Sequence, residues 1–260
     1  MTRTYVVTGS ASGIGAATVA VVKERGFRVI GVDLKDADVV ADLSTPAGRA
    51  DAAEQAISKA GGTVDAVIAA AGISAPKPLT VAVNFFGVTE FLLALQPALA
   101  NSDAPRAVVV SSMATLQPVS DELVNAMLAG NEAQALEIGA ALAAQGEQAG
   151  YLNYPSSKRA LSRWVRRECI TAAWAGAHIP LNAVAPGIVL TPMTTELLAT
   201  EQGTAMVDSS VPMPLNYHQK PEVVALLMAW LTSAENTHTT GQTIYVDGGA
   251  DASIRGDDIW

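Results

Sequence analysis

The chain begins with Thr4-Tyr5-Val6-Val7-Thr8-Gly9-Ser10-Ala11-Ser12-Gly13-Ile14-Gly15, an apolar run that leads directly into a glycine-rich turn. The apolar run predicts a buried strand, and a helical pattern follows the turn. Glycines at this junction allow a tight turn and close approach of the backbone to a pyrophosphate, which a helix N-terminus can bind. The spacing is Gly-x-x-x-Gly-x-Gly rather than Gly-x-Gly-x-x-Gly. We interpret Gly9, Gly13 and Gly15 as part of a nucleotide site rather than loop punctuation.

Short apolar runs alternate with longer helical patterns along the rest of the chain. The expected strands are Thr4–Thr8, Arg28–Val32, Val39–Ala41, Val64–Ala70, Ala107–Ser111, Pro180–Val184 and Thr243–Val246. The expected helices are Ile14–Arg25, Ala50–Lys59, Val81–Ala100, Tyr154–Ala175 and Pro221–Leu231. Unbroken apolar strands between helices are typical of a mainly parallel sheet covered on both faces. The sequence therefore predicts an α/β fold, one doubly wound domain over residues 1–260 with a seven-stranded sheet.

Composition excludes several classes of function. Half of the 260 residues are hydrophobic and 16% are charged, which is enough apolar material for a sizeable core. The net charge of −9, with no offsetting basic cluster, argues against a nucleic-acid partner. Three scattered histidines and Cys169 offer no metal-ligand spacing, and the cysteine is expected to be a buried structural thiol. Neither a signal peptide nor a bilayer-spanning apolar segment is evident, so we expect a cytoplasmic protein without a membrane partner.

A carboxylate at the end of the second strand bears on the choice of dinucleotide. Asp33 can hydrogen-bond the ribose 2′-hydroxyl there, and its charge would repel a 2′-phosphate. Leu34 follows it, and Lys35 is the one basic residue close by. We predict NAD as the cofactor and treat NADP as the less favoured alternative. A solvated turn aspartate is the structural alternative for Asp33.

The run Tyr154-Pro155-Ser156-Ser157-Lys158 places a phenol and an ammonium one helical turn apart. A nearby cation favours the phenolate, so we expect Lys158 to lower the pKa of Tyr154 from about 10 toward working pH. A tyrosine tuned in this way can exchange a proton with an alcohol or a ketone. Such pairs also occur by chance on surface helices, so the meaning of this one depends on the glycine turn.

With both features present, the chain resembles the short-chain dehydrogenase/reductase family over nearly its whole length. Thr8–Gly15 is similar to the family's cofactor turn, Asp42-Leu43 to its adenine-contacting pair, Asn182–Gly187 with Thr191 to the segment that holds the nicotinamide carboxamide, and Asp247–Gly249 to its last turn. Ala69-Ala70-Ala71-Gly72 stands where the family usually has Asn-Asn-Ala-Gly, which removes two side-chain amides that would brace the sheet.

The resemblance implies reversible hydride transfer between the nicotinamide and a carbonyl carbon. In this reaction Tyr154 would be the general acid or base, and Lys158 would lower its pKa and bind the nicotinamide ribose. Ser112 would donate a hydrogen bond to the substrate oxygen, and Asn84 would hold a water that links Lys158 to solvent. The expected cofactor-binding residues are Gly9, Ser12, Gly13, Ile14, Gly15, Asp33, Asp42, Leu43, Ala71, Gly72, Tyr154, Lys158, Pro186, Gly187, Val189 and Thr191.

Two connections have unusual lengths for this family. The stretch from Gly72 to Asn84 is short, and the stretch from Ser112 to Tyr154 is longer by roughly one helical hairpin. Both departures, and the run Asp33–Ser44, are similar to the bacterial 3α-hydroxysteroid dehydrogenase/carbonyl reductase branch. This branch implies a small hydrophobic ketone or alcohol as substrate. The alternatives are an NADP-linked reductase of another hydrophobic ketone and a catalytically silent nucleotide sensor, against which the intact Ser112, Tyr154 and Lys158 argue.

We assign residues 115–150 to a helical insertion. Ser120–Gly146 is expected to form two short helices, the second capped by Asn131 with Gln134 three residues later. The apolar stripe of the second helix would be Leu136, Ala140 and Ala143. Family tetramers commonly use the Tyr154 helix at an interface. The insertion is therefore expected to cover that surface and to favour a homodimer through another face over a homotetramer.

Residues 191–217 occupy the usual place of a substrate-covering segment. Their apolar side chains are Met193, Leu197, Leu198, Met206, Val207, Val211 and Met213. Methionines adapt to irregular apolar shapes, which suits a hydrophobic ketone such as a steroid. An ordinary lid that buries the same residues against its own domain is the alternative. The tail Asp251–Trp260 could close a pocket or an interface.

Overall fold

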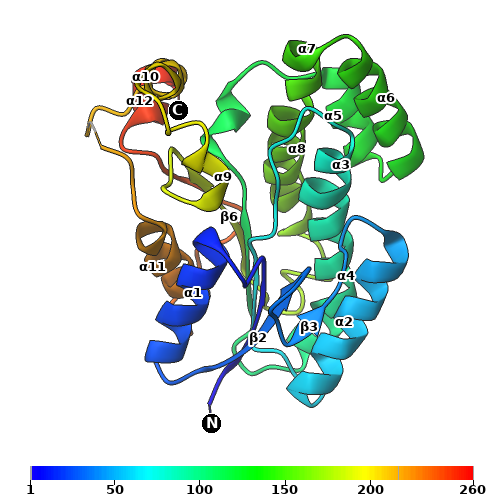
Figure 1. Cartoon of the computed structure of the whole chain (residues 1–260). Coiled ribbons are helices and arrows are strands. Elements are labelled where there is room, and N and C mark those ends of the chain that lie inside the picture. Colours follow the sequence, from blue (N-terminus) through cyan, green and yellow to red (C-terminus); the bar gives the residue numbers. More distant parts are fainter. Residues whose placement is uncertain (1, 216, 260) are drawn as a thin grey trace.

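The computed structural model describes residues 2–215 and 217–259, so Trp260 lies outside the described residues. Seven strands form one sheet in the order β3-β2-β1-β4-β5-β6-β7, and every neighbouring pair is parallel (Figure 1). The strands are β1 Thr4–Thr8, β2 Arg28–Asp33, β3 Val39–Val40, β4 Ala66–Ala69, β5 Arg106–Val110, β6 Leu181–Pro186 and β7 Thr243–Val246. The predicted seven-stranded, doubly wound α/β fold is confirmed.

Helices cover both faces of this sheet. On one face α1 (Gly13–Glu24) packs against α11 (Pro221–Leu231), and on the other lie α2 (Pro46–Ala60), α4 (Gly87–Ala100) and α8 (Asn153–Glu168) (Figure 1). The central strands β1, β4, β5 and β6 are buried along their whole length. This burial on both faces is the physical reason why these strands are unbroken apolar runs rather than alternating ones.

The helical stretch Leu79–Ala100 is long and apolar enough to cross a membrane, by length and composition alone. However, 67% of its most apolar 18-residue segment is buried inside the fold, and the stretch packs against α2 and α8. The stretch consists of α3 (Leu79–Val81), the π-helical turn η1 (Ala82–Phe86) and α4. It is therefore the core helix of this domain, and its π-turn carries Asn84.

The insertion contains three helices, α5 (Asp121–Leu128), α6 (Glu132–Ala144) and α7 (Glu147–Tyr151), of which the third was not predicted. The predicted cap of α6 is present, because Asn131 Oδ1 accepts a hydrogen bond of 3.1 Å from the Gln134 N–H. The predicted stripe is wrong in part, since Ala140 is exposed. The fully buried positions of α6 are Ala135 and Gly139.

Gly139 explains this error. Because glycine has no side chain beyond hydrogen, α6 can approach its neighbours closely there, and no apolar residue marks the contact face in the sequence. A Cβ atom added at Gly139 would lie 2.4 Å from Asn153 Oδ1 and 3.3 Å from the Pro78 Cβ atom. A Cβ atom added at Gly150 would lie 2.8 Å from the Pro76 carbonyl oxygen. The insertion therefore packs on Pro76–Pro78, within the short connection that follows β4. The two connections of unusual length therefore pack against each other.

A buried arginine joins the insertion to the other helices of this face. Arg49 of α2 is 1% exposed, and its Nε atom lies 2.9 Å from Glu90 Oε2 of α4. Its two terminal nitrogens donate hydrogen bonds of 3.0 and 2.6 Å to the carboxylate of Glu132, the first residue of α6. Three helices thus share one charge cluster, in which two carboxylates neutralise an arginine that water cannot reach.

The predicted end of the Tyr154 helix was seven residues too late, because α8 ends at Glu168. The Thr171 N–H and hydroxyl both donate to the Glu168 carbonyl, at 2.9 and 2.8 Å. A threonine that hydrogen-bonds the backbone locally competes with continued helix. Cys169 follows the helix at 4% exposure, in agreement with its predicted role as a buried thiol.

Candidate active site

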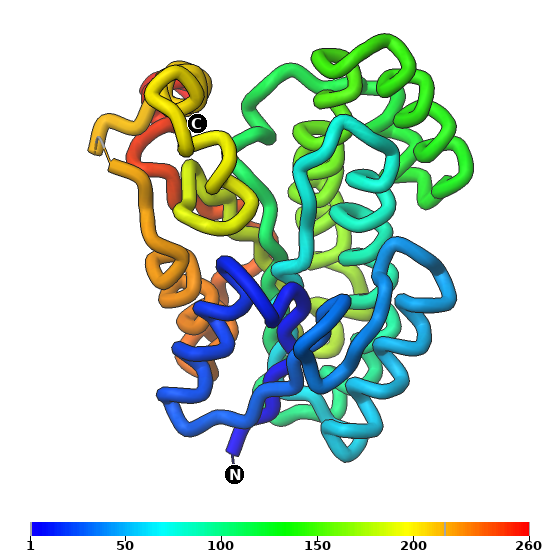
Figure 2. Tube along the Cα trace, in the orientation of Figure 1, coloured from blue at the N-terminus to red at the C-terminus, as the bar shows by residue number. Residues whose placement is uncertain are grey.

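The predicted site residues gather at one edge of the sheet, where the carboxyl ends of the parallel strands meet. In Figure 2 two groups of segments flank this edge. Residues 190–215 and the C-terminal residues lie on one side, and the insertion lies on the other. The edge includes the point where strand order reverses, between β1 and β4. A crevice at such a reversal is where doubly wound sheets bind their ligands.

The glycine turn forms a cradle that side chains would fill. Gly9 and Gly13 have φ angles of 68° and 52°, which L-residues rarely adopt. A Cβ atom added at Gly15 would lie 2.0 Å from the Gly9 carbonyl oxygen, and one added at Gly9 would lie 2.9 Å from the Ala71 nitrogen. The turn is therefore compact because no side chains occupy it, and it presses β1 against the segment after β4.

Helix α1 starts at this cradle, with Ser12 as its N-cap residue. The Ser12 side chain does not accept a hydrogen bond from the first turn, so the N–H groups at the start of α1 remain available to a ligand. Backbone N–H groups and the positive end of a helix dipole suit a phosphate. The residues present fit the pyrophosphate of a dinucleotide, and Ile14 lies in the first turn of α1.

Asp33 lies beside this cradle, at the end of β2. Its Oδ2 atom accepts a hydrogen bond of 2.9 Å from the Ala11 N–H, and its Oδ1 atom accepts one of 2.7 Å from the Leu34 N–H. These bonds hold the carboxylate against the glycine turn, where a ribose would follow the pyrophosphate. Asp42 and Leu43 come just after β3; Leu43 is 8% exposed, and Asp42 binds the Ser44 N–H.

Tyr154 and Lys158 lie in the first turns of α8, with the Lys158 Nζ atom 5.9 Å from the centre of the tyrosine ring. The ammonium donates a hydrogen bond of 2.8 Å to the Val110 carbonyl oxygen at the end of β5. Ser112 follows this strand at 9% exposure, and its hydroxyl accepts a hydrogen bond of 3.1 Å from the Ala114 N–H. Three of the four predicted catalytic side chains thus converge from the end of β5 and from α8.

The expected lowering of the Tyr154 pKa by Lys158 is wrong for this structure. Burial raises the pKa of Tyr154 above its ordinary value, and the hydrogen bond with Ser112 acts in the opposite direction. Burial also lowers the pKa of Lys158 from 10.5 to about 8. The reason is that both groups are withdrawn from water while the ammonium points at the Val110 carbonyl rather than at the phenol.

Asn84 belongs to the π-helical turn η1 and is fully buried. Its Nδ2 atom donates to the Ile73 carbonyl and its Oδ1 atom accepts from the Ile73 N–H, both at 2.9 Å. A Cβ atom added at Gly72 would lie 3.2 Å from Asn84 Oδ1 and 3.4 Å from Lys158 Nζ. Gly72 therefore lets the backbone pass between the asparagine and the lysine. The water that Asn84 would hold stays a prediction.

The segment after β6 reaches back to the glycine turn. A Cβ atom added at Gly13 would lie 3.4 Å from the Thr191 side chain. Thr191 caps α9 (Pro192–Thr195), and its N–H donates to Thr194 Oγ1 at 3.1 Å. Pro186 ends β6, the Gly187 N–H binds the Val246 carbonyl oxygen at 2.9 Å, and Val189 pairs with Gln219 in a single bridge.

Two supporting residues were not predicted from the sequence. The Thr8 hydroxyl accepts a hydrogen bond of 3.0 Å from the Ala71 N–H, which joins the ends of β1 and β4. The Ser111 hydroxyl lies 3.2 Å from the Lys158 carbonyl oxygen and 2.8 Å from Ser162 Oγ, which attaches α8 to β5. The position of Ser162, four residues after Lys158 on the same helix face, was the available signal.

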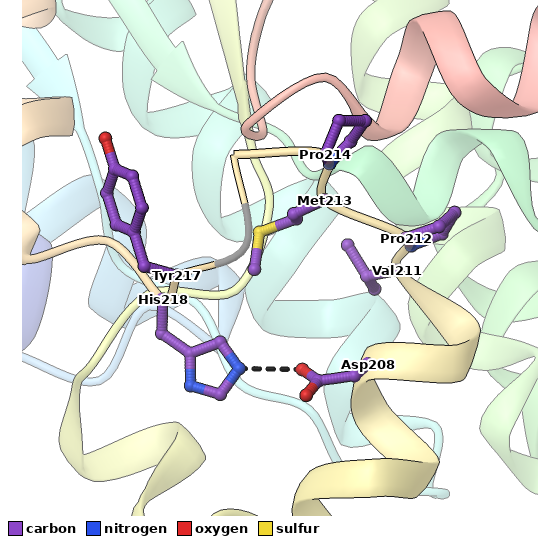
Figure 3. A pocket seen from close by; sticks show the side chains of 7 residues that line it. All are labelled: Asp208, Val211, Pro212, Met213, Pro214, Tyr217 and His218. Carbon is purple, nitrogen blue, oxygen red and sulfur yellow. Dashed lines mark hydrogen bonds and ion pairs between the residues drawn. The ribbon is translucent and has the colours of Figure 1, made fainter.

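A cavity of 530 Å³ lies in the expected substrate-covering segment, beyond α10 (Glu201–Ser210) (Figure 3). It is lined by Asp208, Val211, Pro212, Met213, Pro214, Tyr217 and His218. Two of these lining residues contact each other, with His218 Nε2 2.7 Å from Asp208 Oδ1 (Figure 3). Val211 and Met213 also pack with Met113 and Ile188, so the wall of this cavity contacts the turn that follows Ser112. No group of metal-ligating side chains occurs among the residues that the structure describes.

The family described as Enoyl-(Acyl carrier protein) reductase matches residues 9–251. The 3-alpha-hydroxysteroid dehydrogenase/carbonyl reductase of Comamonas testosteroni is 37% identical over 96% of this chain and 97% of its own length. This chain belongs to the short-chain dehydrogenase/reductase family. As a short-chain dehydrogenase/reductase it is an oxidoreductase, which confirms the enzyme class and the family predicted from the sequence.

Other short-chain dehydrogenases/reductases support the branch as well as the family. The structure of the 3-alpha-hydroxysteroid dehydrogenase from Pseudomonas sp. B-0831 complexed with NADH matches with a TM-score of 0.90 and 38% identity, over 99% of this chain and 100% of that one. The cis-4-hydroxycyclohexanecarboxylate dehydrogenase of Sinomonas cyclohexanicum is 30% identical over 95% of this chain and 96% of its own length. Each of these relatives is named for a secondary alcohol on a ring.

Proposed function

We propose that this protein is an NAD-dependent dehydrogenase/reductase that interconverts a hydrophobic secondary alcohol of the 3α-hydroxysteroid class and its ketone. The observation that carries the proposal is the convergence of Ser112, Tyr154 and Lys158 beside a glycine cradle that Asp33 adjoins. The cofactor-binding set is the one named above, from Gly9 to Thr191. In this proposal the chain is one domain, with the helical insertion 115–150 and the substrate-covering segment 191–217.

Each catalytic side chain has a defined task in this proposal. When bound, the nicotinamide supplies or accepts the hydride. The Tyr154 phenol gives its proton to the ketone oxygen in reduction and takes it back in oxidation. The Ser112 hydroxyl donates a hydrogen bond to the same oxygen as charge develops on it. Lys158, next to the Tyr154 ring, would bind the nicotinamide ribose, and Asn84 keeps the turn beside it in place.

The substrate class is tested with a panel of secondary alcohols, including 3α-hydroxysteroids, assayed by NADH absorbance. Turnover of steroids supports the full proposal. Turnover of other alcohols but of no steroid would contradict the proposed substrate class and would still support the proposed chemistry. Binding of NAD with no turnover of any alcohol or ketone would favour the nucleotide sensor instead.

Exchange of Asp33 for asparagine is expected to shift the cofactor preference toward NADP by at least about tenfold in the ratio of kcat/KM values, because like charges in contact cost several kcal/mol. Asparagine keeps the shape of the side chain and removes the charge that would repel a 2′-phosphate. Steady-state kinetics with NADH and NADPH measure the ratio. Asp38→Asn is the matched control, since Asp38 binds the Gly31 N–H in the same region and is not part of the proposed cofactor set. An unchanged ratio in Asp33→Asn contradicts the assignment.

We further propose a cytoplasmic homodimer that forms through α11. The insertion occupies the side of α4 and α8, whereas α11 exposes an apolar stripe of Val223, Leu226 and Trp230, which are 45%, 52% and 39% exposed. These positions share one face of the helix. Apolar stripes of this kind are typical of protein interfaces.

The Leu226→Glu variant is expected to change a two-chain particle into a one-chain particle at micromolar concentration, because a charge would be buried in the interface. Light scattering after size exclusion measures the mass. Leu93→Glu serves as a control, because Leu93 is 45% exposed on α4. A wild-type mass of four chains, or dissociation by Leu93→Glu alone, rules out the α11 dimer.

A further inference from the structure

We propose that Tyr245 is a positioning residue, whose hydroxyl fixes the turn that carries Ser112 and so directs the Ser112 hydroxyl at the substrate oxygen. Tyr245 lies in β7, far along the chain from the residues that touch the reacting atoms. The inference rests on the proposed function, because it takes Ser112 as the hydrogen-bond donor of that site.

Ser112 belongs to a structure that has little stability of its own. It is the N-cap residue of η2 (Met113–Leu116), a single 3₁₀ turn. The Ser112 hydroxyl accepts from the Ala114 N–H at 3.1 Å, and its carbonyl accepts from the Thr115 N–H at 3.1 Å. Because one short turn has few internal hydrogen bonds, its orientation depends on what holds it from outside. A rotation of the turn would rotate the Ser112 hydroxyl with it.

Thr115 is the residue by which the turn is held, from two directions. Its side chain is 3% exposed, and its Oγ1 atom lies 2.9 Å from the hydroxyl oxygen of Tyr245. Its carbonyl oxygen accepts a hydrogen bond from Arg159 Nε, on α8 directly after Lys158. The turn is therefore attached to β7 through Tyr245 and to the catalytic helix through Arg159.

Tyr245 is itself supported by the C-terminal helix α12 (Ala250–Arg255). The guanidinium of Arg255 lies 5.1 Å from the centre of the tyrosine ring, and its Nη2 atom donates a hydrogen bond of 2.7 Å to Asp251 Oδ2. The ring also packs against the apolar cluster that includes Met113. The ring is thus held by contacts that do not involve its hydroxyl, which makes the hydroxyl separable by mutation.

The Tyr245→Phe variant is expected to lower kcat on the order of tenfold, because small misplacements of a catalytic group are costly. The KM for NAD should stay unchanged, since the exchange removes only the hydroxyl that binds Thr115 and leaves the glycine cradle and the backbone of β7 in place. Thr115→Val removes the other half of the hydrogen bond. If the bond carries the effect, the double variant has the kcat of either single variant, which a double-mutant cycle measures.

A second readout needs no turnover. The hydrogen bond with Ser112 acts to lower the pKa of Tyr154. A displaced Ser112 should therefore raise the titration midpoint of Tyr154 in Tyr245→Phe. The chain has five tyrosines, so ¹³Cζ-tyrosine NMR can follow each ring, with Tyr154→Phe to assign the signal. This readout works even if no alcohol is turned over, which separates a failure of the inference from a failure of the proposed function.

Tyr5→Phe is the matched control. The Tyr5 hydroxyl donates a hydrogen bond of 3.2 Å to the Thr232 carbonyl, and the ring is 1% exposed in β1, at the opposite end from the site. Loss of this buried bond should reduce the melting temperature and leave kcat and the Tyr154 titration unchanged. An unchanged kcat in Tyr245→Phe, an unmoved Tyr154 midpoint, or additive effects of Tyr245→Phe and Thr115→Val would each overturn the inference.

Discussion

Replacing Tyr154 with phenylalanine is expected to lower kcat by about 10³-fold or more, because positioned proton donors contribute about 10² to 10⁴ to the rate. The change removes one hydroxyl from the site and leaves the ring in place. NAD should still bind, since the glycine turn and Asp33 are untouched. NADH absorbance measures turnover, and isothermal titration calorimetry measures NAD binding in the same preparation.

Tyr151 provides the control for this experiment. Its ring lies 6.0 Å from that of Tyr154, and its hydroxyl is 3.4 Å from Gln117 Oε1. The Tyr151→Phe variant removes a hydroxyl from the adjacent ring, and most of the activity should remain. Near-normal turnover of Tyr154→Phe, or an equal loss in both variants, would remove Tyr154 as the proton donor.

The Lys158→Met variant is expected to be inactive and yet more stable than the wild type at neutral pH. Burial lowers the pKa of Lys158 from 10.5 to about 8, so the folded protein holds a costly ammonium below that pH. At about 1.4 kcal/mol per pKa unit, the cost is about 3.5 kcal/mol. Methionine removes the charge and loses the hydrogen bond to Val110, which leaves a net gain of about 1 to 3 kcal/mol in the free energy of unfolding.

The sign of the pH dependence follows from proton linkage. Between about pH 8 and 10.5 the unfolded chain binds more protons at Lys158 than the folded protein does. Wild-type stability from this group therefore rises with pH over that window, and the advantage of Lys158→Met shrinks. Urea unfolding of the cofactor-free protein at about pH 6.5 and about pH 9.5 measures both effects. Lys59→Met, which changes an exposed lysine of α2, should show no such trend; a Lys158→Met variant less stable than wild type at the lower pH contradicts the argument.

The parts of the fold that were predictable are those decided by local pattern. The bounds of β1 and β7 match the expected runs, because a short apolar stretch bounded by polar residues fits a strand better than any other element. The end of α8 was not predictable. The Thr171 hydroxyl binds the Glu168 carbonyl in the folded chain, and the sequence does not show that this local hydrogen bond replaces a further helical turn. Similarly, the contact face of α6 is set by Gly139, and a glycine carries no hydrophobic signal.

The site shows the same division. The order of motifs along the chain indicated the glycine turn, Asp33, Ser112, Tyr154 and Lys158 without any coordinates. The direction of the pKa of Tyr154 was not available in this way, because it depends on how much water surrounds a side chain after folding. The link from Thr115 to Tyr245 spans 130 positions and joins residue types with no motif. Such pairs become visible only when the strand order is known.

The shared charge cluster of Arg49 limits how this enzyme could be shortened. Arg49 is almost inaccessible to water, and Glu132, one of its two counter-ions, belongs to the inserted helices. A chain trimmed of residues 115–150 would leave Arg49 with a single, partly exposed carboxylate, and loss of a partner from a buried pair costs about 3 to 5 kcal/mol. The insertion and the buried arginine of α2 therefore form one electrostatic unit, and the rest of the fold depends on the inserted helices for part of its stability.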